Sequence, residues 1–356
     1  MSGAARASCD NPAMAIDARS TPTDDRFDEL AQRLGGFYLS WVVYLGLELG
    51  LFERIRAAGG GISPSDLATA ARCAPAPVEA WVRAAHAAEI VEYDGQLVTL
   101  PAETASVLLD DSRPEYLGGQ FVAAVVSSLD YATLPEFFRT GQPIAERPPR
   151  FHRAIEAVTV QDIAVFFQEG LAQLPDLAAK LAVGGRVLDV ACGGGKWLIA
   201  IAQRFPATSL VGVEFEPDSV ARAMRHVTDA GLDSRIRIEA RDPQAMPYDA
   251  EFDLVYFQDA LHELPDPVGS LRSAWTAVRP GGRLVVLDWC LPSSLEDSRS
   301  LEAELLWGIQ VDELFQGTTM YTREGFLELF AGASLPRPAV VELISGATLF
   351  TVERPA

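Results

Sequence analysis

One short stretch of the chain combines an acid, small residues and a helix start in an order that suits ligand binding. The apolar run 187–190 carries Asp189 and is followed by a loop of small residues from Ala191 to Gly195. Glycine lacks a Cβ atom, so a ligand can lie directly against the backbone, and the helix that follows begins with unpaired N–H groups. Because the acid precedes the glycines, this order differs from the GxGxxG loop that binds the pyrophosphate of dinucleotides.

A second acid and a histidine follow later apolar runs. Glu214 ends the run 210–213 and lies 25 residues after Asp189, where its carboxylate can accept hydrogen bonds from a ribose diol. His262 follows the run 252–257. An imidazole with its ordinary pKa of ~6.5 is largely neutral at pH 7 and can accept a proton as a general base. Glu214 is therefore a candidate ribose contact, and His262 lies where the carboxyl end of a strand opens to the ligand crevice of such sheets.

The elements expected to position these residues alternate between strand and helix. Five apolar runs in the second half of the chain are too short for helices, and helical patterns join the first three of them as in parallel βαβ units. Two further runs are separated only by Ser345 and Gly346, which predicts an antiparallel hairpin at a sheet edge. The prediction is an α/β fold with a doubly wound, Rossmann-like mixed sheet. Its strands are expected at 186–190, 209–213, 235–239, 252–257, 283–289, 339–344 and 347–353.

The first part of the chain has a mainly helical pattern. Ser63 followed by Pro64 predicts a helix start, and Pro75 opens a second helix. The pair Asp94-Gly95 predicts a tight turn between two short strands, so the order helix, helix, hairpin has a winged-helix outline. The predicted divisions are a disordered tail at 1–24, a mainly helical winged-helix dimerisation domain at 25–110, a helical linker or substrate lid at 111–180, and the α/β domain at 181–356.

Composition and charge limit the class of protein. Of 356 residues, 49% are hydrophobic and 22% charged, which excludes a mainly disordered or collagen-like chain. The net charge of −20 disfavours nucleic acid and acidic membranes as partners. Four scattered cysteines without metal-ligand spacing favour a cytoplasmic location and no bound metal, and the first 25 residues lack the apolar core of a signal peptide. The apolar segment 39–52 is too short to cross a bilayer.

The acid-ended strand and its loop resemble the first motif of the class I S-adenosylmethionine-dependent methyltransferases, Asp/Glu-x-Gly-x-Gly-x-Gly, with Ala191 where the first glycine is usual. The resemblance implies that 181–356 is a class I catalytic domain and that S-adenosyl-L-methionine is its cofactor. It assigns the adenine amino group to Asp242, although Arg241 replaces the usual glycine before that acid. The cofactor contacts expected from it are Asp189, Ala191, Gly193, Gly195, Glu214, Phe215, Asp242 and Gln258.

The segment 261–266 resembles the Leu-His-Asp-Trp-x-Asp stretch of winged-helix O-methyltransferases, in which the histidine removes a proton from a phenol or enol. His262 is therefore the expected base, although related methyltransferases carry this histidine without base catalysis. The partner that orients the imidazole stays open between Glu263 and Asp266. On the helix after residue 160, Glu169 and Asp162 are alternative bases.

The resemblance implies a homodimer that methylates oxygen on a small aromatic or enol metabolite. Two other functions stay open. A basic island at 139–153 could neutralise an anionic acceptor, such as a prenyl diphosphate or keto acid, that is methylated on carbon. The chain could also be a non-catalytic regulator that binds DNA through its winged helix. The substrate contacts expected for an enzyme are Arg150, His152, Phe166, Trp307 and Tyr321.

Overall fold

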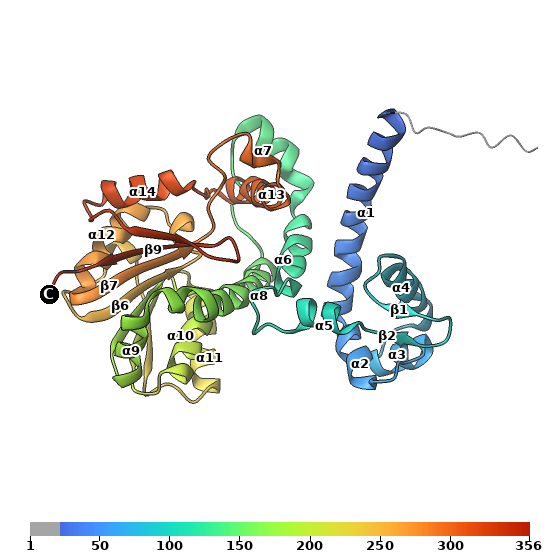
Figure 1. Cartoon of the computed structure of the whole chain (residues 1–356), viewed down its shortest axis with the longest axis horizontal. Helices are drawn as coiled ribbons and strands as arrows, with labels where there is room; N and C mark the ends of the chain where they lie inside the picture. The colour runs from blue at the N-terminus through green and yellow to red at the C-terminus, as the bar shows by residue number, and fades with distance from the viewer. Residues whose placement is uncertain (1–21) are drawn as a thin grey trace, which may run out of the picture.

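The computed structural model describes residues 22–356, which form a helical N-terminal part and a larger α/β part with the long helix α1 between them (Figure 1). Residues 1–21 of the predicted tail, with Cys9, lie outside this range. Helix α1 (Pro22–Glu48) already includes residues 22–24, so the tail prediction is wrong for those three positions.

The N-terminal part contains the predicted order of helix, helix and hairpin. Helix α3 begins after Ser63, whose Oγ accepts the N–H of Asp66 at 3.1 Å and satisfies one free donor of the first turn. In the hairpin turn, Asp94 Oδ1 accepts the N–H groups of Gln96 and Leu97, both at 2.8 Å. After α1 the elements are α2 (Leu51–Ala58), α3 (Pro64–Ala71), α4 (Pro75–Ala87), β1 (Glu92–Tyr93), β2 (Val98–Thr99) and α5 (Ala102–Leu109).

The α/β part contains a seven-stranded sheet in the order β5-β4-β3-β6-β7-β9-β8. Strands β5 to β7 in this order are parallel, and the C-terminal hairpin β8–β9 joins β7 antiparallel. The predicted doubly wound mixed sheet is confirmed. Its strands are β3 (Arg186–Val190), β4 (Ser209–Glu214), β5 (Ile236–Ala240), β6 (Phe252–Gln258), β7 (Val278–Asp288), β8 (Ala339–Glu342) and β9 (Thr348–Glu353).

Each face of the sheet has its own apolar core, because strands covered by helices on both sides bury all their side chains. On one face Trp197 stacks on Tyr256 with ring centroids 4.1 Å apart, and the fully buried Phe166 packs against both rings. On the other face Phe326 and Phe350 lie in contact. The covering helices are α9 (Pro175–Val183), α10 (Lys196–Arg204) and α11 (Pro217–Asp229) on the first face, and α12 (Pro267–Ala277) and α14 (Arg323–Gly332) on the second.

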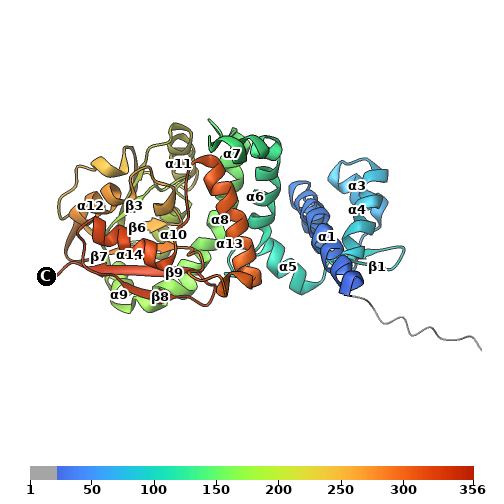
Figure 2. The same ribbon diagram turned by 90° about the horizontal axis from the view of Figure 1, so that it is seen from above.

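A helical layer connects the two parts and covers one end of the sheet. Figures 1 and 2 both place α13 beside α6 and α7, and the N–H of Ile144 donates to Phe315 O of α13 at 2.8 Å. The layer consists of α6 (Gly118–Ser128), η1 (Tyr131–Thr133), α7 (Leu134–Thr140), α8 (Pro149–Val165), η2 (Phe166–Gly170), η3 (Leu171–Gln173) and α13 (Leu301–Gln316). Short turns η4 (Pro243–Ala245), η5 (Leu261–Glu263) and η6 (Asp297–Arg299) complete the chain.

No single helix in 22–356 is long and apolar enough to cross a membrane, although α1 with α2, and α6 with η1 and α7, meet that test as bent pairs. Cys73, Cys192 and Cys290 are free thiols.

The close crossing of α6 and α8 generates a stability prediction. A Cβ atom at Gly119 would lie 2.0 Å from the carbonyl oxygen of Ala157, so the backbones must separate to admit one. Gly119→Ala is expected to lower the free energy of unfolding by about 1–3 kcal/mol, the usual cost of overpacking, in a urea titration.

Gly308 in α13 is the matched control, because a Cβ there meets nothing within 4 Å. Gly308→Ala should raise stability by up to about 1 kcal/mol through helix propensity. Equal unfolding midpoints for the two variants would contradict the crossing geometry.

Candidate active site

The carboxyl ends of β3, β4, β6 and β7 bring acidic side chains to one edge of the sheet, around a cavity of about 560 Å³. Asp189 lies near the end of β3, Glu214 ends β4, and Asp259 follows β6; all three line the cavity. This is the edge at which open parallel sheets bind ligands. The cavity therefore collects the acids that the sequence placed at strand ends.

The loop after β3 turns by alternating its backbone conformation. Ala191, Gly193 and Gly195 have φ values of 58°, 52° and 72°, in the left-handed region that suits glycine. A Cβ atom at Gly193 would meet nothing within 4 Å, whereas one at Gly194 would lie 2.6 Å from a carboxylate oxygen of Glu156. The loop thus presents bare backbone to the cavity at Gly193 and packs tightly behind it.

Glu214 braces this loop. One carboxylate oxygen accepts the N–H of Gly193 at 2.9 Å, and the other accepts those of Phe215 and Glu216, both at 2.8 Å. A carboxylate has about four acceptor sites, so one remains for a ligand hydroxyl. Phe215 is half exposed at the cavity rim, where its ring can stack on a flat ligand.

Asp189 is only 3% exposed. Burial, and then repulsion from Glu214, raises the pKa of its carboxyl well above the usual range. A ligand that brings a positive charge would restore the ionised form. The ammonium and sulfonium of S-adenosylmethionine meet that requirement, and the open backbone at Gly193 leaves room beside it, so the residues present fit this cofactor.

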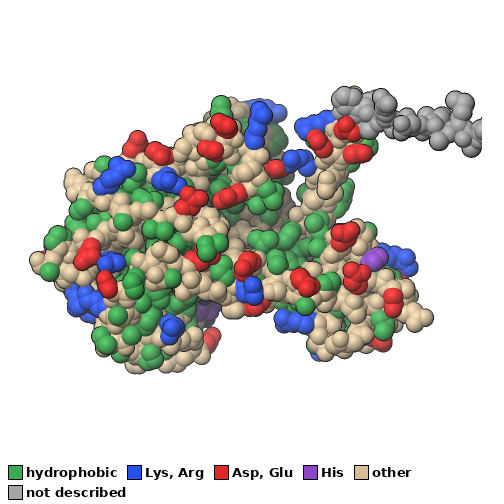
Figure 3. Space-filling view, viewed as in Figure 1, with side chains coloured by type: hydrophobic (Ala, Val, Ile, Leu, Met, Phe, Trp, Pro, Cys, Tyr) green, Lys and Arg blue, Asp and Glu red, His purple; other side chains and the backbone are tan. Residues whose placement is uncertain are grey.

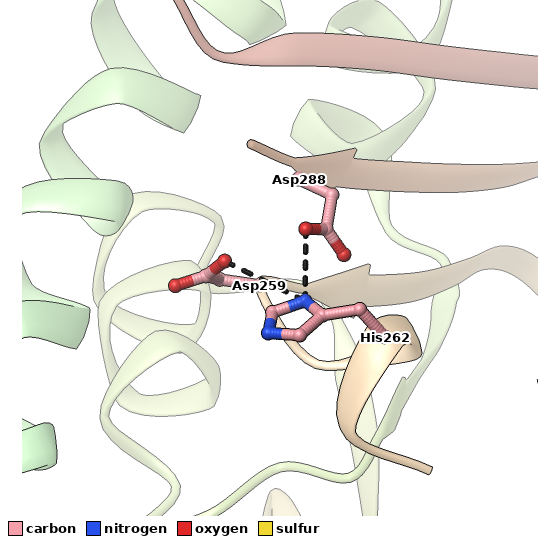
Figure 4. Close-up of side chains that lie close together, drawn as sticks. All are labelled: Asp259, His262 and Asp288. Carbon is pink, nitrogen blue, oxygen red and sulfur yellow. Dashed lines mark hydrogen bonds and ion pairs between the residues drawn. The ribbon is translucent and has the colours of Figure 1, made fainter. Parts of the chain in front are cut away.

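His262 lies behind the cavity wall, held by a carboxylate from the next strand (Figure 4). Its Nδ1 is 2.9 Å from Asp288 Oδ1, and both side chains are buried. Asp259 Oδ1 lies 4.0 Å from the same nitrogen, and Glu313 Oε2 lies 3.9 Å from Nε2. Because a carboxylate accepts from Nδ1–H, the neutral imidazole keeps Nε2 free as its proton acceptor.

The charges around the imidazole favour its protonated form. Burial lowers the pKa of His262, but attraction to Asp288 and the hydrogen bond that Nδ1 donates to it outweigh burial and raise that pKa well above its usual value. Burial and the neighbouring Asp288 also raise the pKa of Asp259 to about 7. Two groups of side chains have atoms close enough to hold a metal ion, within 4.8 Å of one another in each group. One group is Asp259, His262 and Asp288, and the other is His262, Glu263 and Glu313.

A further buried acid lies on α8. Asp162 is 1% exposed, and its Oδ1 accepts the indole N–H of Trp289 at 3.2 Å. The backbone N–H of Trp289 donates to Asp288 Oδ1 at 2.9 Å. The end of β7 therefore carries, in two adjacent residues, the carboxylate that holds His262 and the indole that holds Asp162.

The structure brings most of the predicted cofactor residues to the cavity. Gly195 stands one step back as the N-cap of α10. Asp242 is exposed, caps η4 by accepting the N–H of Gln244 at 2.9 Å, and does not line the cavity. The predicted residues that do line it are Asp189, Ala191, Gly193, Glu214, Phe215, Gln258 and His152.

Several other predicted residues do not line the cavity. Glu169 accepts the N–H and Oγ–H of Ser345, both at 3.0 Å, away from the cavity, so the alternative base is not supported. Trp307 is partly exposed and donates to Ser298. Phe166 belongs to the core. Tyr321 packs beside Phe326 on the other face of the sheet.

Two arginines of the predicted basic island form internal ion pairs with carboxylates of other segments. Arg147 is buried, pairs with Asp312 and Asp130, and lies within 5.0 Å of the ring centroids of Phe151 and Phe315. Arg150 pairs with Asp130 and does not line the cavity. These contacts tie the loop before α8 to α13.

Sequence reasoning missed the partner of the imidazole. Neither candidate forms that contact, since Asp266 caps α12 by accepting the N–H of Gly269 at 2.8 Å. The missed residue, Asp288, ends an apolar run as Asp189 nearly does, and its strand pairs with the strand preceding His262. Glu313 gives no such signal because it belongs to a helix.

Comparison with known proteins identifies the domain. A methyltransferase-domain family model matches residues 181–325. The chain is 30% identical over 177 residues to the 27-O-demethylrifamycin SV methyltransferase of Amycolatopsis mediterranei, covering 49% of this chain and 63% of that protein. It is 31% identical over 129 residues to the demethylmenaquinone methyltransferase of Lactiplantibacillus plantarum, covering 36% and 53%. It thus spans less than two thirds of these curated relatives.

Solved structures share the fold over nearly the whole chain. The PigF structure with SAH has a TM-score of 0.71 at 19% identity, covering 94% of this chain and 99% of that one. Human N-acetylserotonin methyltransferase with SAM has a TM-score of 0.69 at 17% identity, covering 95% and 100%. With the family match, this shows that residues 181–325 form a methyltransferase domain, and that the chain has the fold of these solved methyltransferase structures.

Proposed function

We propose that the chain transfers the methyl group of S-adenosylmethionine to an oxygen of a small aromatic or enol metabolite, with His262 as the general base. The observation that carries this proposal is the buried hydrogen bond between His262 Nδ1 and Asp288, directly behind the cavity wall at Asp259 and Glu263. A base held in one tautomer beside a methyl-donor seat is the arrangement that deprotonation of a hydroxyl requires.

Each residue around the imidazole would have its own role in the methyl transfer. The bound cofactor supplies an electrophilic methyl group. His262 Nε2 takes the proton from the acceptor hydroxyl, so the oxygen gains the electron pair with which it attacks. Asp288 keeps Nδ1 protonated and stabilises the imidazolium that forms, and Glu313 adds a negative charge 3.9 Å from Nε2. Most of the rate gain would come from alignment and from this proton transfer.

Fewer observations support the two alternative functions, C-methylation of an anionic acceptor and DNA binding. Curated relatives include both C-methyltransferases and a ubiquinone biosynthesis O-methyltransferase, so the preference for oxygen rests on His262. Of the three arginines expected to neutralise an anionic acceptor, Arg147, Arg150 and Arg153, the first two are paired with carboxylates. Arg83 of α4, which would contact DNA in a winged-helix regulator, pairs with Glu79.

We also propose a homodimer built through α1. Several apolar side chains in the first half of this helix are exposed although Arg33 of the same segment pairs with Glu304 of α13 (Figures 1 and 3). Leu30, Leu34 and Tyr38, spaced by four, are 50%, 60% and 63% exposed, and a second copy would cover them. The N-terminal part would then be the winged-helix dimerisation domain of a cytoplasmic enzyme.

The cofactor seat gives one prediction. Asp189→Asn removes the charge that would face the cofactor and should raise the Kd for S-adenosylmethionine about 10-fold to 100-fold, as expected for a lost hydrogen bond to a charged group. Isothermal titration calorimetry measures it. Asp242→Asn is the control, because Asp242 is exposed and lies outside the cavity. The Kd of this variant for S-adenosylmethionine should change less than about 3-fold. An equal rise in Kd for the two variants would contradict the proposed cofactor site and indicate one nearer β5.

The imidazole gives a second prediction. Since His262 must be neutral to act and Asp288 raises its pKa, kcat/KM should climb as pH rises above 7. Asp288→Asn removes the attraction that favours the imidazolium, so the rise should move to lower pH while kcat falls about 100-fold or more from lost orientation.

Asp266→Asn, which keeps the cap of α12, should leave both the profile and kcat unchanged. An unchanged profile in Asp288→Asn, or loss of activity in EDTA with recovery on adding a divalent cation, would contradict metal-free base catalysis by His262.

The surface of α1 gives a third prediction. Light scattering after size-exclusion chromatography should give twice the chain mass of 38.4 kDa. Leu34→Glu combined with Tyr38→Glu should give the single mass, because buried unpaired charges oppose association. Val183→Glu, at an apolar residue of α9 that is 84% exposed, should stay dimeric. A monomeric parent chain would rule the dimer out.

A further inference from the structure

The methionine carboxylate of the cofactor needs a partner that Asp189 and Glu214 do not provide. S-adenosylmethionine combines a cationic sulfonium and a cationic ammonium with this single carboxylate. Acids that line the cavity can pair with the two cationic groups, whereas a carboxylate taken out of water without a cation or polar hydrogens costs free energy. The lysine and arginine side chains that line the cavity are therefore the candidates to bind it.

Three such side chains line the cavity in the part of the chain that the structure describes, Arg147, Lys196 and Arg222. Two of them are already paired, Arg147 with Asp312 and Arg222 with Glu156. Lys196 forms no ion pair with any carboxylate between residues 22 and 356, and its Nζ donates to the backbone oxygen of Glu156 at 3.1 Å. An ammonium has three donors, so two of them remain for a ligand.

Lys196 lies at the opposite end of the small-residue loop from Asp189. The acid belongs to β3, which precedes the loop, and the lysine is the first residue of α10, which follows it. Both line the cavity, as does the open backbone at Gly193 between them. An amino acid carries its ammonium and its carboxylate on one carbon, and the positive end of the α10 dipole also favours a carboxylate here. The loop therefore offers opposite charges to the two groups.

Contacts from α8 and α11 hold the acceptor of this lysine in place. The carboxylate of Glu156 pairs with Arg222, whose Nη2 donates to Ser219 Oγ at 2.9 Å. A Cβ atom at Gly194 would lie 2.6 Å from Glu156 Oε1, so this glutamate packs directly against the loop. Because the ammonium of Lys196 is already held by Glu156 O, less side-chain freedom is lost when it binds a ligand.

We propose that Lys196 binds the carboxylate of the cofactor's methionine moiety, on the other side of the loop from Asp189. This rests on the proposed function and specifies how its cofactor is held. The chain would then discriminate against adenosyl compounds that lack the carboxylate. A site built for a hydrogen-bonding group rejects a ligand without it, because its own polar group is left unpaired.

The chain contains two lysines, and their surroundings differ. Lys180 of α9 lies outside the cavity, pairs with Asp253 at 3.3 Å and donates to Gly281 O at 2.8 Å. Its charge is thus compensated within the chain, as expected for a lysine that only joins two elements. Lys196 has a backbone oxygen but no carboxylate, so a ligand can supply the anion.

The test compares two ligands that differ only in this carboxylate, S-adenosylhomocysteine and its decarboxylated analogue, which keeps the ammonium. Isothermal titration calorimetry with the purified full-length chain gives both Kd values. The parent chain should bind S-adenosylhomocysteine about 10-fold to 100-fold more tightly, as expected for a hydrogen bond between charged groups. Lys196→Met keeps an apolar stem but removes the ammonium, so its two Kd values should agree within about 3-fold.

Lys180→Met is the matched control, because that lysine lies outside the cavity, and it should keep the parent ratio of the two Kd values. An equal loss of affinity for both ligands in Lys196→Met would overturn the inference, since the lysine would then only support the shape of the site. An unchanged ratio in Lys196→Met would overturn it as well.

Chemical modification of the parent chain gives a second readout, which decides even if Lys196→Met fails to fold. Acetic anhydride acetylates lysine amines, and mass spectrometry of the peptides follows Lys180 and Lys196 separately. At saturation nearly all of the chain is bound, so S-adenosylhomocysteine should slow acetylation of Lys196 about 10-fold, and the decarboxylated analogue less than about 3-fold. Lys180 should react at the same rate throughout. Equal protection of Lys196 by both ligands, or by neither, would contradict the proposal.

Neither measurement contains a methyl acceptor, so both are independent of base catalysis by His262. If S-adenosylhomocysteine does not bind at all, the proposed function loses its cofactor and this inference fails with it. If both ligands bind the parent chain equally well, the inference alone fails.

Discussion

Buried carboxylates at the end of a parallel sheet need positive charge or polar hydrogens, and this requirement shapes the whole site. Glu214 satisfies it with three backbone N–H groups, which fixes the small-residue loop against β4. Asp288 satisfies it with an imidazole N–H. Among residues 22–356, no cation contributes to the pKa of Asp189, so a ligand would have to supply the positive charge. The chemistry of the site follows from which acids are satisfied internally and which are not.

The sequence predicted the fold well because the strands are nearly continuous apolar runs. The first strand of the sheet has the expected bounds, 186–190, and the C-terminal hairpin turns near Ser345 and Gly346 as expected. Burial on both faces makes such runs visible without any tertiary information. The cofactor loop was equally predictable, since glycine adopts the positive φ values found at Gly193 and Gly195 without a steric penalty.

The substrate side was much harder to predict because it depends on contacts between segments distant in the chain. The sequence suggests that Arg150 binds an anion of the substrate. In the structure its guanidinium donates instead to Asp130, which lies twenty positions earlier in the chain. A phenylalanine such as Phe166 is more often core than pocket wall, and its packing against Trp197 and Tyr256 places it in the core. Asp288 could have been found from the neighbouring strand end, whereas Glu313 comes from a helix whose position no local pattern gives.

The pairing of Arg147 has a consequence for turnover. Its guanidinium joins the segment before α8 to α13 through Asp130 and Asp312, and both of these segments contribute residues to the cavity wall, including Ile144 and Gln316. The segment before α8 and α13 therefore cannot move apart unless the ion pairs of Arg147 separate. Release of a bulky product would require that separation. Substitutions of Arg147 would therefore change the rate of product release more than the rate of methyl transfer.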